Sequence, residues 1–149
     1  MTSKLPLACT LLGLAACLAG CGTTPLASPK ADALAKLMEP APGKAVIYLF
    51  RNEPPSAPWP VSVTLDSKPM GKTGAQTYFR WEVDPGQHIV ISYGEGWSGL
   101  TIEAAAGHSY YVWQDIYMGF FQPRSELKLV DRITAQINLR SCHLLQTKS

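Results

Sequence analysis

From residue 45 onward, apolar and polar side chains follow the two-residue period of β-strands. Residues 46–50 are all apolar, which predicts a strand covered on both faces. Residues 61–65 and 79–83 alternate between apolar and polar positions, which predicts strands with one buried face. Further strands are expected at residues 69–73, 89–93, 100–104 and 109–117, and around Leu127 and Leu129.

These segments predict a mainly β domain, a small antiparallel β-sandwich of seven or eight short strands. Parallel pairing is not expected, because the pattern leaves no room for crossover helices. The turn sequence at residues 84–87 suits a type II turn and predicts a hairpin there. After Asp131, the spacing of Ile133 and Ile137 predicts a short C-terminal helix.

The first twenty residues have a different pattern, with Lys4 followed by an uncharged apolar run at residues 5–18. This layout is typical of a secretory signal, and the run is shorter than the roughly 20 residues that a membrane span needs. The segment from Leu18 to Cys21 resembles the lipobox of bacterial lipoproteins. The resemblance implies cleavage before Cys21 and lipid on its sulfur; an ordinary signal peptide is the alternative.

The chain therefore divides into a signal at residues 1–20, a lipidated tether at residues 21–44 and a β-sandwich domain at residues 45–149. Prolines and Gly43 interrupt the tether, which favours a mostly flexible spacer. A short helix within it would place Leu34, Leu37 and Met38 on one side. By the sorting rule of Gram-negative lipoproteins, Gly22 favours the outer membrane, with the domain facing the periplasm.

Charge and motifs give little sign of chemistry. Without residues 1–20 the chain has 12 basic and 11 acidic side chains, a balance that gives no reason to expect nucleic acid. No hydrolase, metalloprotease or nucleotide-binding motif occurs, so we expect no enzyme, cofactor or metal. His88 and His108 are more simply turn residues than a metal pair. Cys142, without a partner in the mature domain, is expected to be a small buried side chain.

Ordered short motifs resemble a family of small bacterial lipoproteins whose shared domain has no assigned function. The motifs are Tyr48 to Arg51, Tyr78 and Phe79 before Pro85, Gly86 and His88, and Gly107 before Tyr110 and Tyr111. The resemblance covers about residues 44–145. The Pro-Gly turn between strands also resembles small modules with a PEGA signature, which implies a prealbumin-like sandwich. Neither resemblance implies an active site.

The large aromatic side chains fall into two groups. Those at alternating strand positions, such as Tyr48, Phe79 and Trp81, are expected in the core. Four others lie in connections rich in Gly and Pro, which makes them candidate contact residues or, equally, caps over the core: Trp59, Trp97, Phe120 and Phe121. If successive strands alternate in direction, the connections at residues 52–60, 94–99 and 118–125 all lie at the end away from the lipid.

The sequence thus predicts a membrane-anchored envelope lipoprotein that acts as a binding or structural module for a protein or cell-wall partner. The candidate partner-binding residues are Trp59, Trp97, Phe120 and Phe121, and the lipidation site is Cys21. The alternative is a hydrolase or metal-dependent enzyme of the envelope that uses residues without a recognisable motif.

Overall fold

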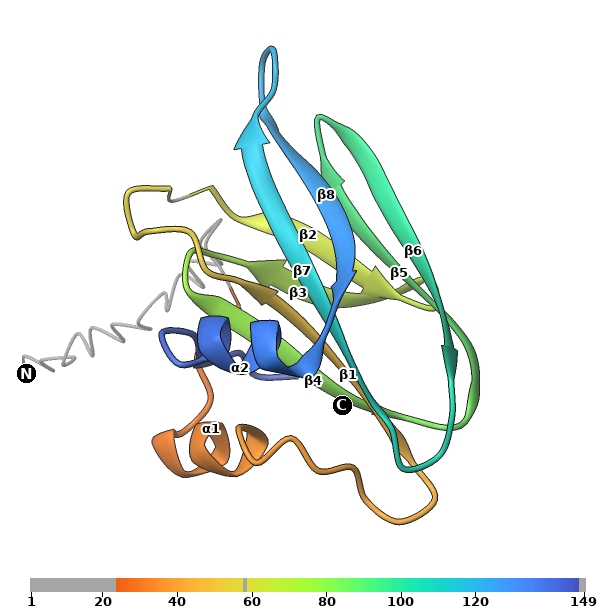
Figure 1. Ribbon diagram of the computed structural model, residues 1–149. Helices are drawn as coiled ribbons and strands as arrows, with labels where there is room; N and C mark the ends of the chain where they lie inside the picture. The colour runs from red at the N-terminus through yellow and green to blue at the C-terminus, as the bar shows by residue number, and fades with distance from the viewer. Residues whose placement is uncertain (1–23, 58, 148–149) are drawn as a thin grey trace, which may run out of the picture.

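Two β-sheets face each other in the computed structural model, which describes residues 24–57 and 59–147 (Figure 1). The elements in chain order are α1 (Pro29–Ala35), β1 (Ala45–Arg51), β2 (Val61–Leu65), β3 (Lys68–Thr73), β4 (Thr77–Val83), β5 (Gly86–Gly94), β6 (Gly96–Ala104), β7 (Ser109–Met118), β8 (Pro123–Val130), α2 (Arg132–Leu139) and β9 (His143–Leu144). The large sheet has the strand order β8-β7-β1-β4-β9 and the small sheet β3-β2-β5-β6. The predicted mainly β sandwich with a short C-terminal helix is confirmed.

Strand β1 lies at the centre of the large sheet, and all seven of its residues are buried. Ile47 and Leu49 on one face join the core between the two sheets, while Tyr48 and Phe50 on the other face pack beneath the helices. A strand covered on both faces needs an unbroken apolar run, which is the pattern that predicted it. In β2, by contrast, Val61, Val63 and Leu65 point inward and alternate with half-buried polar residues.

Two strand pairs are parallel, so the expectation of a wholly antiparallel sandwich is wrong in this detail. β1 pairs with β7, and β4 pairs with β9, in parallel register. The chain between β1 and β7 passes through the small sheet, which replaces the crossover helix that parallel pairing usually needs. The turn after Val83 also differs from prediction, because it leads from β4 in the large sheet to β5 in the small sheet and closes no hairpin.

Three antiparallel hairpins remain: β2–β3, β5–β6 and β7–β8. The β2–β3 turn places Asp66 and Ser67 at φ values of 50° and 66°, the left-handed conformation that two-residue hairpin turns require. The β5–β6 and β7–β8 hairpins extend together beyond the rest of the sandwich (Figure 1). The main-chain N–H of Glu95 in the first donates to the Pro123 oxygen of the second at 2.8 Å.

The segment before β1 packs on the sandwich, which differs from the flexible spacer favoured by the sequence. Ser28 caps α1, Pro29 occupies its first turn, and the Tyr48 hydroxyl donates to the Ala35 oxygen at 2.6 Å. The N–H of Ala27 donates to the oxygen of Leu144 at 2.8 Å. The folded unit therefore includes the described residues before residue 45.

Both helices cover the outer face of the large sheet, and most of the apolar side chains whose spacing predicted them point away from it. In α2, which Asp131 caps, Ala135 and Leu139 are buried while Ile133 and Ile137 are exposed. Next to α1, Met38 is buried but Leu34 and Leu37 are exposed. The small residues Ala35 and Ala135 face the sheet and permit its close approach. Among the described residues, no helix is long and apolar enough to cross a membrane.

Candidate functional site

The tips of the β5–β6 and β7–β8 hairpins carry the most exposed aromatic side chains of the described residues. Phe120 and Phe121 are each 86% exposed, and Trp97 is 74% exposed. The rings of Phe120 and Phe121 meet edge to face with their centroids 4.9 Å apart. These three rings are therefore exposed surface rather than caps over the core. We call residues 94–97 and 118–124 the hairpin tips.

Glu95 holds the two hairpin tips together. Its carboxylate accepts hydrogen bonds from the main-chain N–H groups of Phe121 and Gln122, the latter at 3.0 Å, and from the Arg124 guanidinium at 3.2 Å. The main-chain bonds from Phe121 and Gln122 lower the pKa of Glu95 to about 2. The carboxylate is therefore charged at neutral pH and fixes the loop that presents the two Phe rings.

Two glycines permit this close approach. A Cβ on Gly94 would lie 2.3 Å from the main-chain oxygen of Pro123, in the facing hairpin. A Cβ on Gly119 would lie 2.4 Å from the Gln122 oxygen and 2.8 Å from the carboxylate of Glu95. No side chain fits at either position without moving main chain, so the geometry of the tips depends on these residues being glycine.

Trp97 continues the tip surface onto the outer face of the small sheet. It stands opposite Tyr93 in the β5–β6 pair, and a Cβ on Gly99 would lie 3.3 Å from its ring. Beside the β7–β8 tip, Tyr117 and Met118 are also exposed. Large exposed apolar side chains thus lie at or beside the tips of both hairpins.

Trp59 lies on the loop between β1 and β2, outside the two hairpins that carry the other three predicted residues. β7 continues from Trp113, which stands opposite Phe50, to Met118, so its hairpin projects beyond the end of β1. The loop after β1, which holds Trp59, leaves the sandwich below the tips and to the left in Figure 1. The Trp59 side chain is 40% exposed, and its main-chain oxygen accepts from the Arg51 guanidinium at 2.9 Å. Three of the four residues therefore lie on the two adjoining hairpins, and Trp59 lies on a different loop.

A buried polar network, which the sequence reasoning missed, lies in the core toward the tips. The Gln114 amide donates to Ser92 Oγ at 2.6 Å and accepts from Thr73 Oγ1 at 2.7 Å. Ser92 Oγ also lies 2.6 Å from Ser125 Oγ. The network joins strands of both sheets beneath the hairpins. The sequence holds one signal for this network. Gln114 stands two residues after the inward-facing Val112, so strand alternation places its side chain on the same inward face.

Arg51, at the end of β1, is completely buried beside this network. Its Nε donates to Glu53 at 3.0 Å, and its remaining partners are the main-chain oxygens of Trp59 and Thr73. Glu53 also accepts from the N–H of Ile116 at 3.0 Å. A buried ion pair with this many hydrogen bonds fixes strand ends and loops in place.

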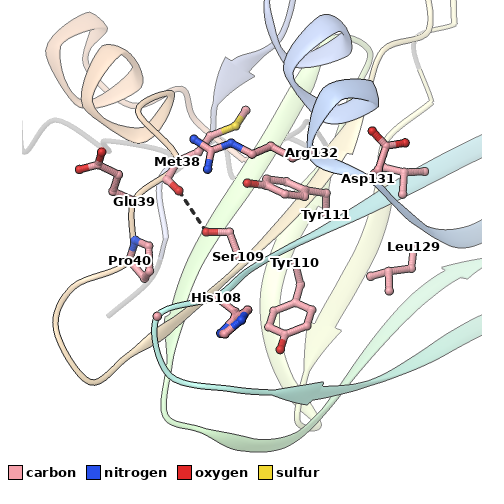
Figure 2. A pocket seen from close by; sticks show the side chains of 12 residues that line it. Met38, Glu39, Pro40, His108, Ser109, Tyr110, Tyr111, Leu129, Asp131 and Arg132 are labelled. Atoms are coloured by element: carbon pink, nitrogen blue, oxygen red, sulfur yellow. Dashed lines mark hydrogen bonds between the residues drawn. The ribbon is translucent and has the colours of Figure 1, made fainter.

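A hollow of about 520 Å³ lies at the opposite end of the sandwich, between the loop after α1, β7 and the start of α2 (Figure 2). Its volume falls within the range of small-ligand sites. Arg132 and Tyr111 line it, and the buried Tyr111 hydroxyl has no hydrogen-bond partner. However, Ser109 Oγ donates to the Met38 oxygen at 3.1 Å and the His108 ring donates to the Ala106 oxygen at 3.0 Å. The lining thus offers binding surface without a nucleophile and base in contact.

His88 and His108 do not form a pair. His88 Nδ1 lies 2.7 Å from an Asp66 carboxylate oxygen, and Nε2 lies 2.7 Å from the Asp84 oxygen. Partial burial acts to lower the pKa of His88, but hydrogen bonds to Asp66 and Asp84 outweigh it and raise the pKa. Both partners are acceptors, so the two bonds form together only on a protonated ring. No group of three or more His, Cys, Asp or Glu suited to a metal occurs within residues 24–57 and 59–147.

Cys142 occupies the buried position expected from the sequence. Its Sγ donates to the Arg51 oxygen at 3.1 Å beneath the helices. Burial raises the pKa of the thiol to about 12, so the reactive thiolate is scarce at neutral pH. Cys21, the predicted lipidation site, lies outside the described residues.

Comparisons with known proteins add one relative. No family model matches the chain, and no solved structure matches it. The chain is similar to an uncharacterised protein of Haemophilus influenzae, with 25% identity over 123 residues, which are 81% of this chain and 73% of the relative. The relative's description names no activity. The functional argument therefore rests on this chain's own residues.

Proposed function

We propose that this chain is an envelope lipoprotein, anchored by lipid on Cys21, whose sandwich presents the hairpin tips to a protein or cell-wall partner. The lipobox resemblance at residues 18–21 and the ordered motifs shared with small bacterial lipoproteins support the anchor. Gly22 favours the outer membrane, with the domain in the periplasm. The lipid supplies attachment to the membrane, and the sandwich supplies the contact.

The observation that carries the proposal is the exposure of Phe120, Phe121 and Trp97 on a braced support. Large exposed rings that gather on one surface commonly mark interaction sites. Glu95 binds the main chain of the Phe loop, and Gly94 and Gly119 seat the hairpins against each other. A preorganised loop loses little conformational entropy on binding, so burial of its rings contributes more fully to affinity.

The alternative, an envelope hydrolase or metal-dependent enzyme, has less support in the described residues. The hollow beside Arg132 has the volume of a small-ligand site, yet the Ser109 hydroxyl and the His108 ring are each hydrogen-bonded to main-chain oxygens. No specific observation favours the enzyme.

Site-specific crosslinking in intact cells tests the proposal. A photo-crosslinking residue at position 121 of the full-length chain should give one adduct of defined mass. An adduct that shrinks on digestion with muramidase identifies the cell wall, and one that yields peptides of a second protein by mass spectrometry identifies a protein. Replacing both Trp97 and Phe120 with Ala should reduce the yield of this adduct. Each central ring typically contributes about 2 kcal/mol, or roughly 30-fold in affinity.

Leu129→Ala is the matched control, because Leu129 is an exposed apolar residue of β8 far from the tip. It should leave the adduct unchanged. Near-ultraviolet circular dichroism should show that the double variant keeps its fold, since the replaced rings are mostly exposed. The proposal is wrong if the folded double variant forms the adduct as well as the parent, or if position 121 gives none.

A further inference from the structure

The first described residue, Thr24, is fixed to the edge of the sandwich. Its N–H donates to the Lys72 oxygen at 3.1 Å, and the Lys72 N–H donates to Thr24 Oγ1 at 2.8 Å. The N–H of Ala27 then binds the C-terminal segment at Leu144. These contacts join the edge strand β3 of the small sheet to the β9 edge of the large sheet. The chain before Thr24 therefore starts from a fixed point on the domain.

The proposed lipid stands very close to this point. Cys21 precedes Thr24 by three residues. An extended chain advances at most about 3.6 Å per residue, so the Cα atoms of Cys21 and Thr24 lie within about 11 Å of each other. This distance is about the diameter of one helix with its side chains, roughly 10–12 Å. A domain tied this closely to a lipid anchor must rest one face on the bilayer.

The helix layer, α1 and α2 with Leu37, adjoins this point and exposes aliphatic side chains. α1 begins five residues after Thr24, and Leu26 between them is 52% exposed. Both helices cover the outer face of the large sheet (Figure 1). Their outward sides carry four aliphatic residues that are 59–70% exposed: Leu34, Leu37, Ile133 and Ile137. Ile133 and Ile137 lie on the side of α2 opposite the buried Ala135 and Leu139, while Leu34 and Leu37 are exposed beside the buried Ala35 and Met38.

The charges of the helix layer suit an anionic lipid surface. Its exposed cations are Lys30, Arg132 and Arg140. Of its acids, Asp32 is paired with Lys36 at 2.8 Å, and Asp131 accepts from Thr134 as the cap of α2. Glu39 is the remaining carboxylate. Helices with an aliphatic outer side flanked by Lys and Arg are typical of interfacial membrane helices, and cations near anionic lipid strengthen such binding.

We infer that the helix layer rests on the bilayer that carries the Cys21 lipid, with its aliphatic side chains at the level of the headgroups. The inference rests on the proposed lipid anchor. In this arrangement the helix layer contacts lipid, whereas the hairpin tips contact the proposed partner. The tips project from the ends of β5 and β7 rather than from the helix layer, so they stay accessible to a partner.

Spin labels on the full-length lipidated protein, reconstituted into phosphatidylethanolamine and phosphatidylglycerol vesicles, test the inference. Single variants Ile137→Cys, Ile89→Cys and Phe121→Cys report on the helix layer, the outer face of the small sheet and the hairpin tips. Cys142 is buried and reacts slowly, so the introduced thiol takes the label. The label at position 137 should lose most of its accessibility to a water-soluble relaxing agent on reconstitution. Labels at positions 89 and 121 should keep theirs.

Adding Ile133→Glu to the labelled Ile137→Cys protein should restore accessibility at position 137, because the new charge opposes burial in the interface. Shielding at position 89 or 121 instead, or at none of the three, overturns the inference. Mass spectrometry of the same samples reports the lipid on Cys21. Absence of that lipid refutes the proposed anchoring, whereas a lipidated protein with the wrong pattern of shielding refutes this orientation alone.

Discussion

The helix layer and the hairpin tips both expose large apolar side chains, but they differ in chemistry and in support. The helix layer presents Leu and Ile from regular helices, with Arg and Lys nearby. The tips present Phe and Trp from loops, which Glu95 and two glycines hold in place. Aliphatic side chains with cations suit a fluid lipid surface, while fixed rings suit a shaped partner. Exposure alone would not have separated the two surfaces.

Removing the lipid anchor should have the largest effect, because the proposed membrane contact of the helix layer depends on it. In the full-length chain, Cys21→Ser should abolish lipid labelling and block maturation, because serine cannot form the thioether. The protein should then fail to partition into detergent as the mature form. Cys17→Ser, within the predicted signal, should process and label normally. A Cys21→Ser protein that still matures at this site and partitions with detergent would leave the helix layer without its reason to face a bilayer.

The tips should be more sensitive to a single methyl group than to the loss of a whole ring. In Gly119→Ala, the new Cβ clashes with the Gln122 oxygen and the Glu95 carboxylate, which should destabilise the fold by about 1–3 kcal/mol. Phe120→Ala, at the adjacent position, should change stability by less than about 0.5 kcal/mol, because the ring is 86% exposed. Chemical denaturation of both variants measures the difference. Equal stabilities would mean that the tips are not braced as described.

The strands of the sandwich could be predicted from the sequence, because burial of one face imposes a two-residue period on their apolar and polar side chains. Residues 46–50 and 61–65 have the predicted burial patterns. The parallel pairing of β1 with β7 did not follow, since nothing local in either strand encodes a crossover through another sheet. The same limit explains the turn at residues 84–87, whose residues specify a bend but not whether its strands pair.

The helices show a second limit. Periodicity predicted a helix after Asp131, but it did not show which side of that helix faces the sheet. The structure turns the smaller Ala135 inward together with Leu139, because a helix lies closer to a sheet over a small residue. For the candidate site, residue type identified Trp97, Phe120 and Phe121 as surface candidates. Residue type did not show that Trp59 lies on a different loop from these three. The length of β7 beyond the end of β1 decides where its hairpin tip lies.

Buried polar residues were the least predictable feature. Arg51 was read as the end of a strand, yet it is fully buried, since Glu53, Trp59 and Thr73 supply its hydrogen-bond partners from three different segments. Such partners are distant in sequence, so no local pattern announces them. Gln114 is similar, because its burial depends on Thr73 and Ser92 from the other sheet.

Removing the charge of Glu95 should have the smallest effect, and this effect should be confined to the hairpin tips. Its pKa of about 2 in the folded protein lies below the usual value of 4.5, so its contribution is complete above pH of about 4.5. That contribution is lost as the pH falls through about 2.

At neutral pH, Glu95→Gln removes the charge and weakens the bonds from the N–H groups of Phe121 and Gln122. Hydrogen exchange at these two amides should therefore speed up in the variant, while amides of α2 keep their parent rates. Faster exchange across α2 as well would show that the tips and the helix layer are coupled, and unchanged exchange at the tips would remove Glu95 as their brace.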